Sequence, residues 1–248
     1  MAQWHFDGYY TEGIIGNAME TLKRLAAEHS INLSPEMLSQ FEKYYEMLIS
    51  WNEKVNLTAI TDKTEVEIKH FADSILPAGD IPQNATLCDV GTGAGFPGIP
   101  LKIVRPDLHV TLLDSLNKRV AFLQEVCTAL KLSHTVCLHA RAEDAGQGNL
   151  RESFDIVTSR AVARLNTLCE YALPLVKPGG CFLAYKANCE EELIEAKNAI
   201  RVLGGDVEHV DKLLICGQHR AIVKIRKVGA TPKKYPRGRG KEKNAPIL

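Results

Sequence analysis

Short apolar runs alternate with amphipathic segments after residue 84, and this alternation limits the fold more than any other feature of the 248-residue chain. Helical periodicity is clear in SLNKRVAFLQEVCTAL and EEELIEAKNAIRVL. The apolar runs that we expect to be strands span residues 85–90, 109–114, 134–139, 154–159 and 181–185. Nearly continuous apolar strands separated by helices predict an α/β fold, with a parallel sheet covered on both faces.

The last part of the pattern, HVDKLLICGQHRAIVKIRKV, departs from this alternation. Its two strand-like runs are separated only by CGQHR, which leaves no room for a crossover helix, so we expect an antiparallel hairpin at the end of the sheet. A mostly parallel, seven-stranded, Rossmann-like sheet that ends in such a hairpin is typical of class I S-adenosylmethionine-dependent methyltransferases. We therefore expect a methyltransferase domain over residues 84–228.

The first 83 residues are predicted to form an N-terminal helical extension. Apolar residues recur at helical spacing in residues 17–29, 34–54 and 63–76, and Ser34 with Pro35 is a typical helix start. Tyr44, Tyr45 and Trp51 could stack on nucleic-acid bases, but their helical spacing favours a place in or near the core.

Composition favours a soluble globular protein with a sizeable core, because 45% of the residues are apolar and 24% are charged. The seven cysteines are spread singly, which predicts reduced, mostly buried thiols and no metal site. The first thirty residues lack the pattern of a signal peptide, and no run of 18 apolar residues occurs. We expect a cytoplasmic protein, without a membrane partner and monomeric.

The formal net charge of zero conceals a basic end, since residues 224–248 carry nine Lys or Arg against one Glu. The rest of the chain has a net charge of minus eight. This asymmetry predicts a flexible basic tail at residues 229–248 that binds an anionic partner, although a merely solvated terminus would look the same.

The stretch CDVGTGAGFPG at residues 88–98 predicts a nucleotide-like ligand. It contains GAGFPG, which satisfies the dinucleotide fingerprint, but Asp89 at the strand exit would lie near a pyrophosphate. S-adenosylmethionine instead carries a sulfonium and an ammonium, which a carboxylate attracts. Gly91, Gly93 and Gly95 would let the chain pass close to such a ligand.

Two later strand ends fit the same ligand. Asp114 ends the next strand, 23 residues after Gly91, where an acid can accept hydrogen bonds from both ribose hydroxyls. The third strand leads into HARAED, where Ala142 and Glu143 could meet the adenine edge. The acid at residue 114 fits either a dinucleotide or S-adenosylmethionine, so Asp89 remains the residue that separates the two ligands.

Several stretches together resemble one family, the 16S ribosomal RNA guanine-N7 methyltransferase G family, also called the glucose-inhibited division protein B family. The stretches are WNEKVNLTAI, KHFADS, DVGTGAGFPGIPL, LLDSLNKRVAFL, RAED and SRAVA. The resemblance covers roughly residues 30–228. It implies S-adenosylmethionine-dependent methylation at N7 of one guanine in the 530 loop of 16S rRNA, within the 30S subunit or its precursor. The cofactor contacts that it implies are Gly91, Phe96, Ala142, Glu143 and Arg160.

The resemblance also makes RNA the expected partner of the basic tail. Lys233, Lys234, Arg237 and Arg239 would contact the RNA backbone together with Arg160. We expect deletion of residues 231–248 to weaken RNA binding in a salt-dependent way and to leave the affinity for S-adenosylmethionine unchanged.

Guanine N7 has an exposed lone pair and no proton to lose, so direct in-line transfer of the methyl group needs no general base. The fourth strand has the stretch DIVTSRA, which begins with Asp155, in place of the [DN]-P-P-[YF] string used to methylate exocyclic amines. Asp155 could be catalytic or could cap a strand end or turn. His70, Asp73 and Lys186 are weak catalytic candidates.

Arg160 follows a strand at the edge where ligands bind in open α/β sheets, so its guanidinium could hold a phosphate or the carboxylate of the cofactor. A surface salt bridge is the alternative. Other functions remain open from sequence: a methyltransferase for a small molecule, a ribosome-assembly RNA-binding protein without activity, and a dinucleotide oxidoreductase. Asp89 and the closing hairpin disfavour the last of these.

Overall fold

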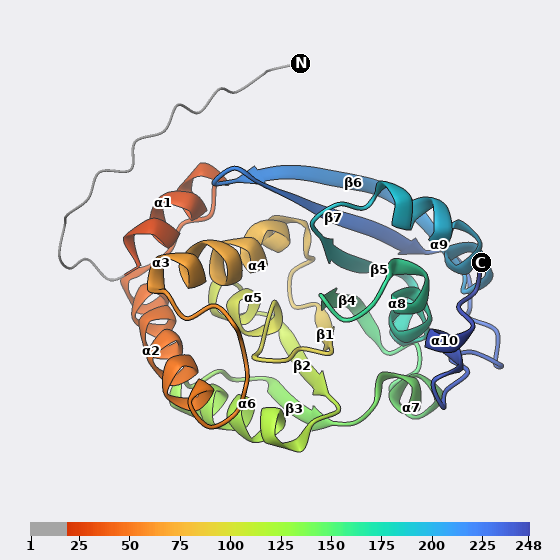
Figure 1. Ribbon diagram of the computed structural model, residues 1–248, viewed down its shortest axis with the longest axis horizontal. Helices are drawn as coiled ribbons and strands as arrows, with labels where there is room; N and C mark the ends of the chain where they lie inside the picture. The colour runs from red at the N-terminus through yellow and green to blue at the C-terminus, as the bar shows by residue number, and fades with distance from the viewer. Residues whose placement is uncertain (1–18) are drawn as a thin grey trace, which may run out of the picture.

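A computed structural model describes residues 19–248 and shows helices on both faces of one central sheet (Figure 1). The helical extension contains α1 (Glu20–Glu28) and α2 (Pro35–Asn52), followed by one continuous helical segment. That segment runs through α3 (Lys63–Val66), the π-helix η1 (Glu67–Ala72), α4 (Asp73–Ile75) and the 3-10 helix η2 (Leu76–Asp80). The expected helices are present, and Ser34 caps α2 by accepting a hydrogen bond from the backbone N–H of Met37 at 3.2 Å. Residues 17 and 18 of the first expected helix lie outside the described residues.

The sheet has seven strands in the order β3-β2-β1-β4-β5-β7-β6. Strands β1 to β5 run parallel, while β7 is antiparallel to both β5 and β6. The strands are β1 (Thr86–Val90), β2 (His109–Asp114), β3 (Thr135–His139), β4 (Phe154–Arg160), β5 (Val176–Lys186), β6 (Gly205–Ile215) and β7 (Gln218–Lys227). The predicted, mostly parallel sheet that ends in an antiparallel hairpin is confirmed.

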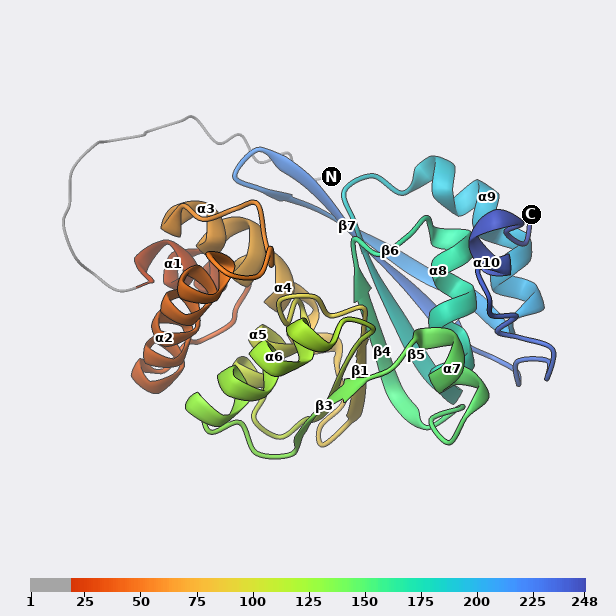
Figure 2. The same cartoon turned by 60° about the horizontal axis from the view of Figure 1, so that its bottom comes forward.

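The helices between the strands divide between the two faces of the sheet, as Figure 2 shows. They are α5 (Gly98–Val104), α6 (Asn117–Ala129), α7 (Ala142–Gln147), α8 (Leu165–Ala172), η3 (Leu173–Leu175) and α9 (Glu190–Val202). Successive strand residues point to opposite faces, so Leu87 and Leu112 join a core with α5, α6 and the N-terminal helices. Cys88 and Leu113 join a second core with α8 and α9.

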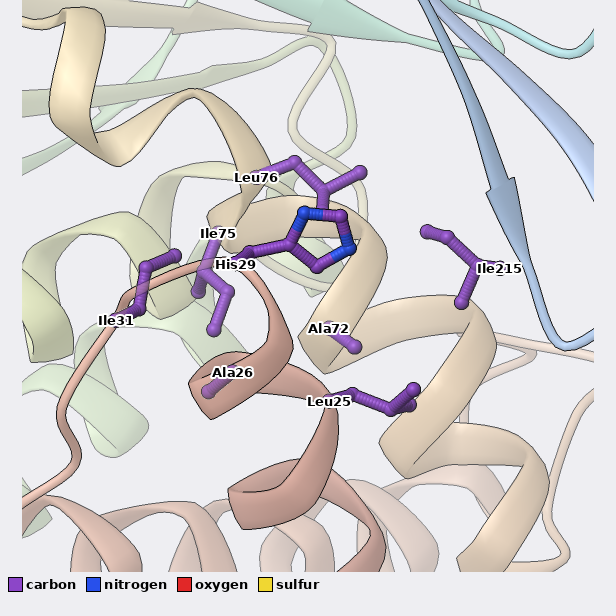
Figure 3. Close-up of a pocket in the computed structure, with 8 residues that line it drawn as sticks. All are labelled: Leu25, Ala26, His29, Ile31, Ala72, Ile75, Leu76 and Ile215. Atoms are coloured by element: carbon purple, nitrogen blue, oxygen red, sulfur yellow. The ribbon is translucent and has the colours of Figure 1, made fainter. Parts of the chain in front are cut away.

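The tip of the β6–β7 hairpin reaches the N-terminal helices. Ile215 at the end of β6 is 3% exposed and faces Leu25 of α1 and Ala72 of the π-helix across a small apolar cavity (Figure 3). The volume of this cavity is about 10 Å³, roughly the space of one water molecule. It is a packing gap where three elements meet, and it joins the hairpin to the helical extension.

The C-terminal segment, residues 229–248, differs from the flexible tail that the charge pattern suggested. It lies along α7 and α8 and contains the short helix α10 (Lys241–Asn244), as Figures 1 and 2 show. Tyr235 is 8% exposed and belongs to the second core, and Arg151 donates hydrogen bonds to the carbonyl oxygens of Thr231 and Tyr235. An apolar anchor and backbone hydrogen bonds thus fix a segment whose composition is that of a solvated tail.

All seven cysteines are free thiols, and most of them are buried as expected. Cys127 of α6 and Cys137 of β3 lie closest to each other, with their sulfur atoms 3.8 Å apart. Over residues 19–248, no helix combines the length and the apolar character that spanning a membrane requires.

Candidate functional site

The glycine loop follows β1 and is built around Asp89. This carboxylate is fully buried, and its Oδ2 accepts hydrogen bonds from the Thr92 hydroxyl at 2.6 Å and from the Gly98 N–H at 2.8 Å. Its Oδ1 accepts a hydrogen bond from Thr158 of β4 at 3.3 Å. Burial raises the pKa of Asp89 to about 6, against the opposing effect of these hydrogen bonds. Asp89 therefore shapes the loop from inside, whereas the sequence had suggested a carboxylate that faces the ligand.

The three glycines of the loop all have positive φ, but they serve different purposes. A Cβ on Gly91 would lie 2.5 Å from Val162, and one on Gly95 would lie 2.5 Å from Ile99. A Cβ on Gly93 would meet nothing closer than a backbone oxygen at 4.0 Å, so this glycine borders open space. The loop is packed tightly at its two ends and leaves room for a ligand at its middle.

Asp114 ends β2 beside this open glycine. Its Oδ2 accepts a hydrogen bond from the Gly93 N–H at 2.9 Å, and its Oδ1 accepts one from the Leu116 N–H at 2.9 Å. The side chain is nearly buried, and each oxygen keeps a second lone pair. Asp114 thus fixes the loop and can still accept hydrogen bonds from hydroxyl groups of a ligand.

The RAED segment lies at the same edge of the sheet, because β3 pairs with β2 and His139 stands opposite Asp114. Ala142 and Glu143 form the first turn of α7, directly after this strand. Glu143 is 9% exposed, and Arg141 before it is largely exposed. The position of this turn beside Asp114 suits the adenine end of a nucleoside.

Arg160 ends β4 and joins the N-terminal helices to the glycine loop. Its Nη1 donates a hydrogen bond to Asp73 at 2.9 Å and another to the carbonyl oxygen of Lys69 at 3.0 Å. Its guanidinium lies 5.0 Å from the centre of the Phe96 ring, and the His70 ring stacks on Phe96 at 4.6 Å. The structure therefore brings Arg160, Asp73, His70 and Phe96 into one cluster.

Apart from the inward-facing carboxylate of Asp89, these features assemble the predicted cofactor contacts at the carboxyl edge of β1 to β4, which is where ligands bind in open α/β sheets. The chain matches the family model for rRNA small subunit methyltransferase G over residues 37–222. It belongs to the rRNA small subunit methyltransferase G family. The resemblance seen in the sequence is thereby confirmed.

Named relatives share about half of their residues with this family member. The ribosomal RNA small subunit methyltransferase G of Bacillus subtilis is 55% identical over 227 residues, which cover 89% of this chain and 95% of the relative. The protein of the same name from Staphylococcus aureus strain N315 is 50% identical over 235 residues, with coverages of 93% and 98%. Such a match extends through the N-terminal helices and the sheet.

Solved structures support the fold alone, since their sequences are distant. A SAM-dependent methyltransferase from Aquifex aeolicus superposes with a TM-score of 0.52 at 18% identity, over 71% of this chain and 97% of that chain. M. jannaschii TYW2 in complex with AdoMet gives a TM-score of 0.52 at 17% identity, over 62% and 74%. Family membership makes this chain an rRNA small subunit methyltransferase, and the solved structures agree with its fold.

Sequence reasoning missed several residues that support the cluster around Arg160. Asn52 at the end of α2 accepts hydrogen bonds from the N–H groups of Leu57 and Thr58 at 2.8 and 2.9 Å. The Thr58 hydroxyl lies 2.8 Å from Nε2 of His70. The WNEKVNLTAI motif therefore orients His70, and only long-range contacts could have revealed this role.

Burial, together with the charge of Arg160, lowers the pKa of His70 to about 4. The ring is therefore neutral at physiological pH. Nδ1 lies 3.3 Å from Nη2 of Arg160 and 3.2 Å from the carbonyl oxygen of Lys69, and the tautomer of the ring decides which of these contacts is a hydrogen bond. His70 thus helps to hold Arg160 and Phe96 in place.

A second arginine reaches Asp73 from the closing hairpin. Arg220 of β7 lies 3.0 Å from Oδ1 of Asp73, so one nearly buried carboxylate faces two guanidinium groups. Tyr44 closes the other side of the cluster, because its hydroxyl donates a hydrogen bond to the carbonyl oxygen of Ala94. The expected place of Tyr44 in the core is confirmed, since its side chain is fully buried.

Two other candidates take structural positions. Lys186 donates hydrogen bonds to Glu192 at 2.7 Å and to the carbonyl oxygen of Ala163 at 2.8 Å, which ties down the loop after β4. Asp155 lies at the start of β4, away from the ligand edge, and accepts hydrogen bonds from the backbone and hydroxyl of Thr86. Of the two roles weighed for Asp155, the structural one fits its position.

The basic residues of the C-terminal segment differ in exposure. Lys233, Lys234 and Arg239 are exposed, whereas Arg237 is paired with Glu170 at 2.7 Å. Within residues 19–248, one group of potential metal ligands lies close together, with Asp80, His209 and Asp211 atoms within 4.8 Å of one another. That group is on the surface of η2 and β6, remote from the cofactor edge in sequence and fold.

Proposed function

We propose that the protein transfers the methyl group of S-adenosylmethionine to N7 of one guanine in the 530 loop of 16S rRNA. The observation that carries this proposal is the convergence of Gly93, Asp114 and the Arg160 cluster on one edge of the sheet. The family to which the chain belongs supports rRNA as the substrate. The guanine and its position come from the resemblance described above.

The residues at this edge fit the cofactor. The open side of Gly93 would receive its amino acid and ribose portion, and Asp114 would accept hydrogen bonds from the ribose hydroxyls. Ala142 and Glu143 would border the adenine. When bound, S-adenosylmethionine supplies an electrophilic methyl group on a sulfonium.

Methyl transfer depends on how the methyl group and guanine N7 are positioned and needs no proton transfer, because N7 already has a free lone pair. A neutral His70, with a pKa near 4, does not need to accept a proton from this substrate. Its stacking on Phe96 and its contact with Arg160 instead keep these two side chains beside the glycine loop. Arg160, held by Asp73, would hold either a phosphate of the RNA or the cofactor carboxylate.

RNA would also lie along the exposed cations of the C-terminal segment. Lys233, Lys234 and Arg239 have exposed side chains on a segment that is itself held in place. Such cations contribute affinity for phosphates without choosing a base. We further propose a cytoplasmic monomer that acts on the rRNA within the 30S subunit or its precursor.

One assay tests the proposal and its alternatives together. The protein is incubated with methyl-labelled S-adenosylmethionine and, in parallel, with 30S subunits, naked 16S rRNA and a small-molecule extract. We expect label in 16S rRNA, and borohydride and aniline cleavage followed by reverse transcription should map it to one guanine in the 530 loop. Label only in a small molecule, or none at all, would refute the proposed substrate.

A further inference from the structure

Three carboxylates gather around Tyr171 next to the first turn of α7. Glu170 and Glu242 are each 1% exposed, and Glu143 is 9% exposed. Burial raises the pKa of the Tyr171 hydroxyl most, and the charges of these three residues raise it further. The Tyr171 hydroxyl donates a hydrogen bond to Glu242 at 3.1 Å. Three carboxylates that are this deeply buried require a positive charge nearby.

Arg237 of the C-terminal segment supplies a largely buried positive charge at this place. Its Nε and Nη2 donate to the two oxygens of Glu170 at 2.9 and 2.7 Å, and its backbone N–H donates to Oε1 at 2.8 Å. Such a bidentate pair is among the stronger and more directional contacts in proteins. Arg141 also approaches Glu143, at 3.6 Å, but its side chain is 69% exposed.

The residues on either side of Arg237 run along α7. Pro236 lies against Gly146, where a Cβ would be 3.1 Å from its ring, and its carbonyl oxygen accepts a hydrogen bond from Gln147. At the other end, a Cβ on Gly238 would lie 3.8 Å from Cγ of Glu143. The segment thus touches α7 at both ends of the helix, including a residue predicted to border the cofactor.

We propose that the C-terminal segment is a fixed wall of the cofactor site, and that Arg237 is the positioning residue that holds it there. The identity of the ligand rests on the proposed function. Without the charge of Arg237, Glu170 would be left buried and unpaired, so residues 236–238 would loosen from α8 and α7 would lose the support of these residues. The first turn of α7 would then no longer be held beside Asp114.

Calorimetric titration of S-adenosylmethionine into the full-length protein tests this inference without any RNA. We expect Arg237→Gln to raise the Kd at least fivefold and Arg237→Lys to raise it less. Arg237→Gln combined with Glu170→Gln should bind within about threefold of wild type, because the unpaired buried charge is gone. Lys243→Ala removes an exposed cation of the same segment and should leave the Kd unchanged.

A second control separates position from general stability. Arg105 donates hydrogen bonds to the carbonyl oxygens of Ala78 and Ile81, at the opposite end of the sheet. Arg105→Gln should lower the melting temperature without changing the Kd. In the free protein, Arg237→Gln should also speed hydrogen exchange of the amides in residues 142–147.

The inference fails if Arg237→Gln binds S-adenosylmethionine within twofold of wild type, or if Arg105→Gln raises the Kd equally. If the wild-type protein itself does not bind S-adenosylmethionine, the proposed function fails instead. The two failures are therefore distinguishable. If Arg237→Gln weakens binding as expected, deletion of residues 231–248 should also weaken binding of S-adenosylmethionine. The expectation from sequence was that this deletion leaves the affinity unchanged.

Discussion

The N-terminal helices and the C-terminal segment reach the same edge of the sheet by different means. The helical extension packs through apolar and aromatic side chains, with Phe41, Tyr44 and Phe71 all fully buried. The C-terminal segment buries Tyr235 and is held in addition by ion pairs and hydrogen bonds, such as those of Arg237 and Arg151. One meets the glycine loop, while the other meets α7.

This difference explains why one end was predictable and the other was not. Apolar residues at helical spacing require a partner surface, so the sequence of the N-terminal end already indicates packed helices. A run rich in Lys, Arg, Gly and Pro has the composition of a disordered tail, and its partner acids lie far away in the sequence. Ion pairs with residues distant in the sequence produce no periodic pattern from which an ordered segment could be predicted.

The largest effect should come from breaking the N-terminal contact to the glycine loop at Phe96. Its ring is 5% exposed and touches Tyr44, Phe71, His70 and Arg160. Phe96→Asp should abolish binding of S-adenosylmethionine in calorimetry and, like other losses of a buried aromatic, cost about 3–5 kcal/mol of stability.

Because Phe96→Asp can unfold the protein, Phe96→Leu is the informative companion. It keeps apolar volume and loses the stacking on His70 and Arg160, so it should weaken binding about tenfold. Phe41→Leu is the matched control, since Phe41 packs against Phe71 in the same core, with the two rings tilted. Equal binding by wild type and Phe96→Leu would mean that the aromatic ring has no role in the site.

Most of the fold followed from the sequence, but the positions of side chains in the site did not. Strand order and the hairpin follow from the alternation of segments and from the length of CGQHR. Asp89 was placed correctly at the strand end, yet its carboxylate turns inward, because its partners Gly98 and Thr158 come from later parts of the chain. Asp89 and Asp114, two acids near the carboxyl ends of neighbouring strands, thus have different surroundings.

A smaller effect is expected at the contact between the helical extension and β4. Arg160→Gln removes the ion pair with Asp73 and the contact with Phe96, while Arg220 still neutralises Asp73. We expect the rate of methyl transfer to 16S rRNA to fall about a hundredfold, as for other charged groups that position a substrate. Single-turnover transfer measures this rate, and Arg220→Gln is the comparison. A rate near that of wild type would exclude Arg160 from the site.

The low pKa of His70 predicts a pH dependence of stability. The folded protein holds this ring neutral down to about pH 4, whereas the unfolded chain protonates it near 6.5. The free energy of unfolding should therefore fall as the pH is lowered from 6.5 to 4, because only the unfolded chain protonates His70 in this range. The loss should be at most about 2 kcal/mol after allowance for partial exposure. Urea unfolding of wild type and His70→Gln measures the difference. The opposite contribution of Asp89 is present in both proteins, and a difference that stays constant with pH would contradict the prediction.

The smallest effect concerns the exposed cations of the C-terminal segment. Replacing Lys233, Lys234 and Arg239 by Ala should reduce the slope of log K against log salt for RNA binding by up to about 2. The affinity for S-adenosylmethionine should stay unchanged, which separates these residues from Arg237. Lys197→Ala, an exposed cation on α9, is the control for general charge. An unchanged salt slope in the triple variant would mean that these three cations do not contact RNA.

In the π-helix Glu67–Ala72, the number of residues matters to the site as well as their identity. Val66 before it packs in the core, while Asp73 after it meets Arg160. A wider turn places one residue more between these two positions than an α-helix would, and one residue of an α-helix corresponds to a rotation of about 100°. The number of residues between Val66 and Asp73 therefore sets the angle, around the helix axis, between the side chain that packs in the core and the one that meets Arg160. Substitutions in this stretch can preserve that angle, but an insertion or deletion of one residue cannot.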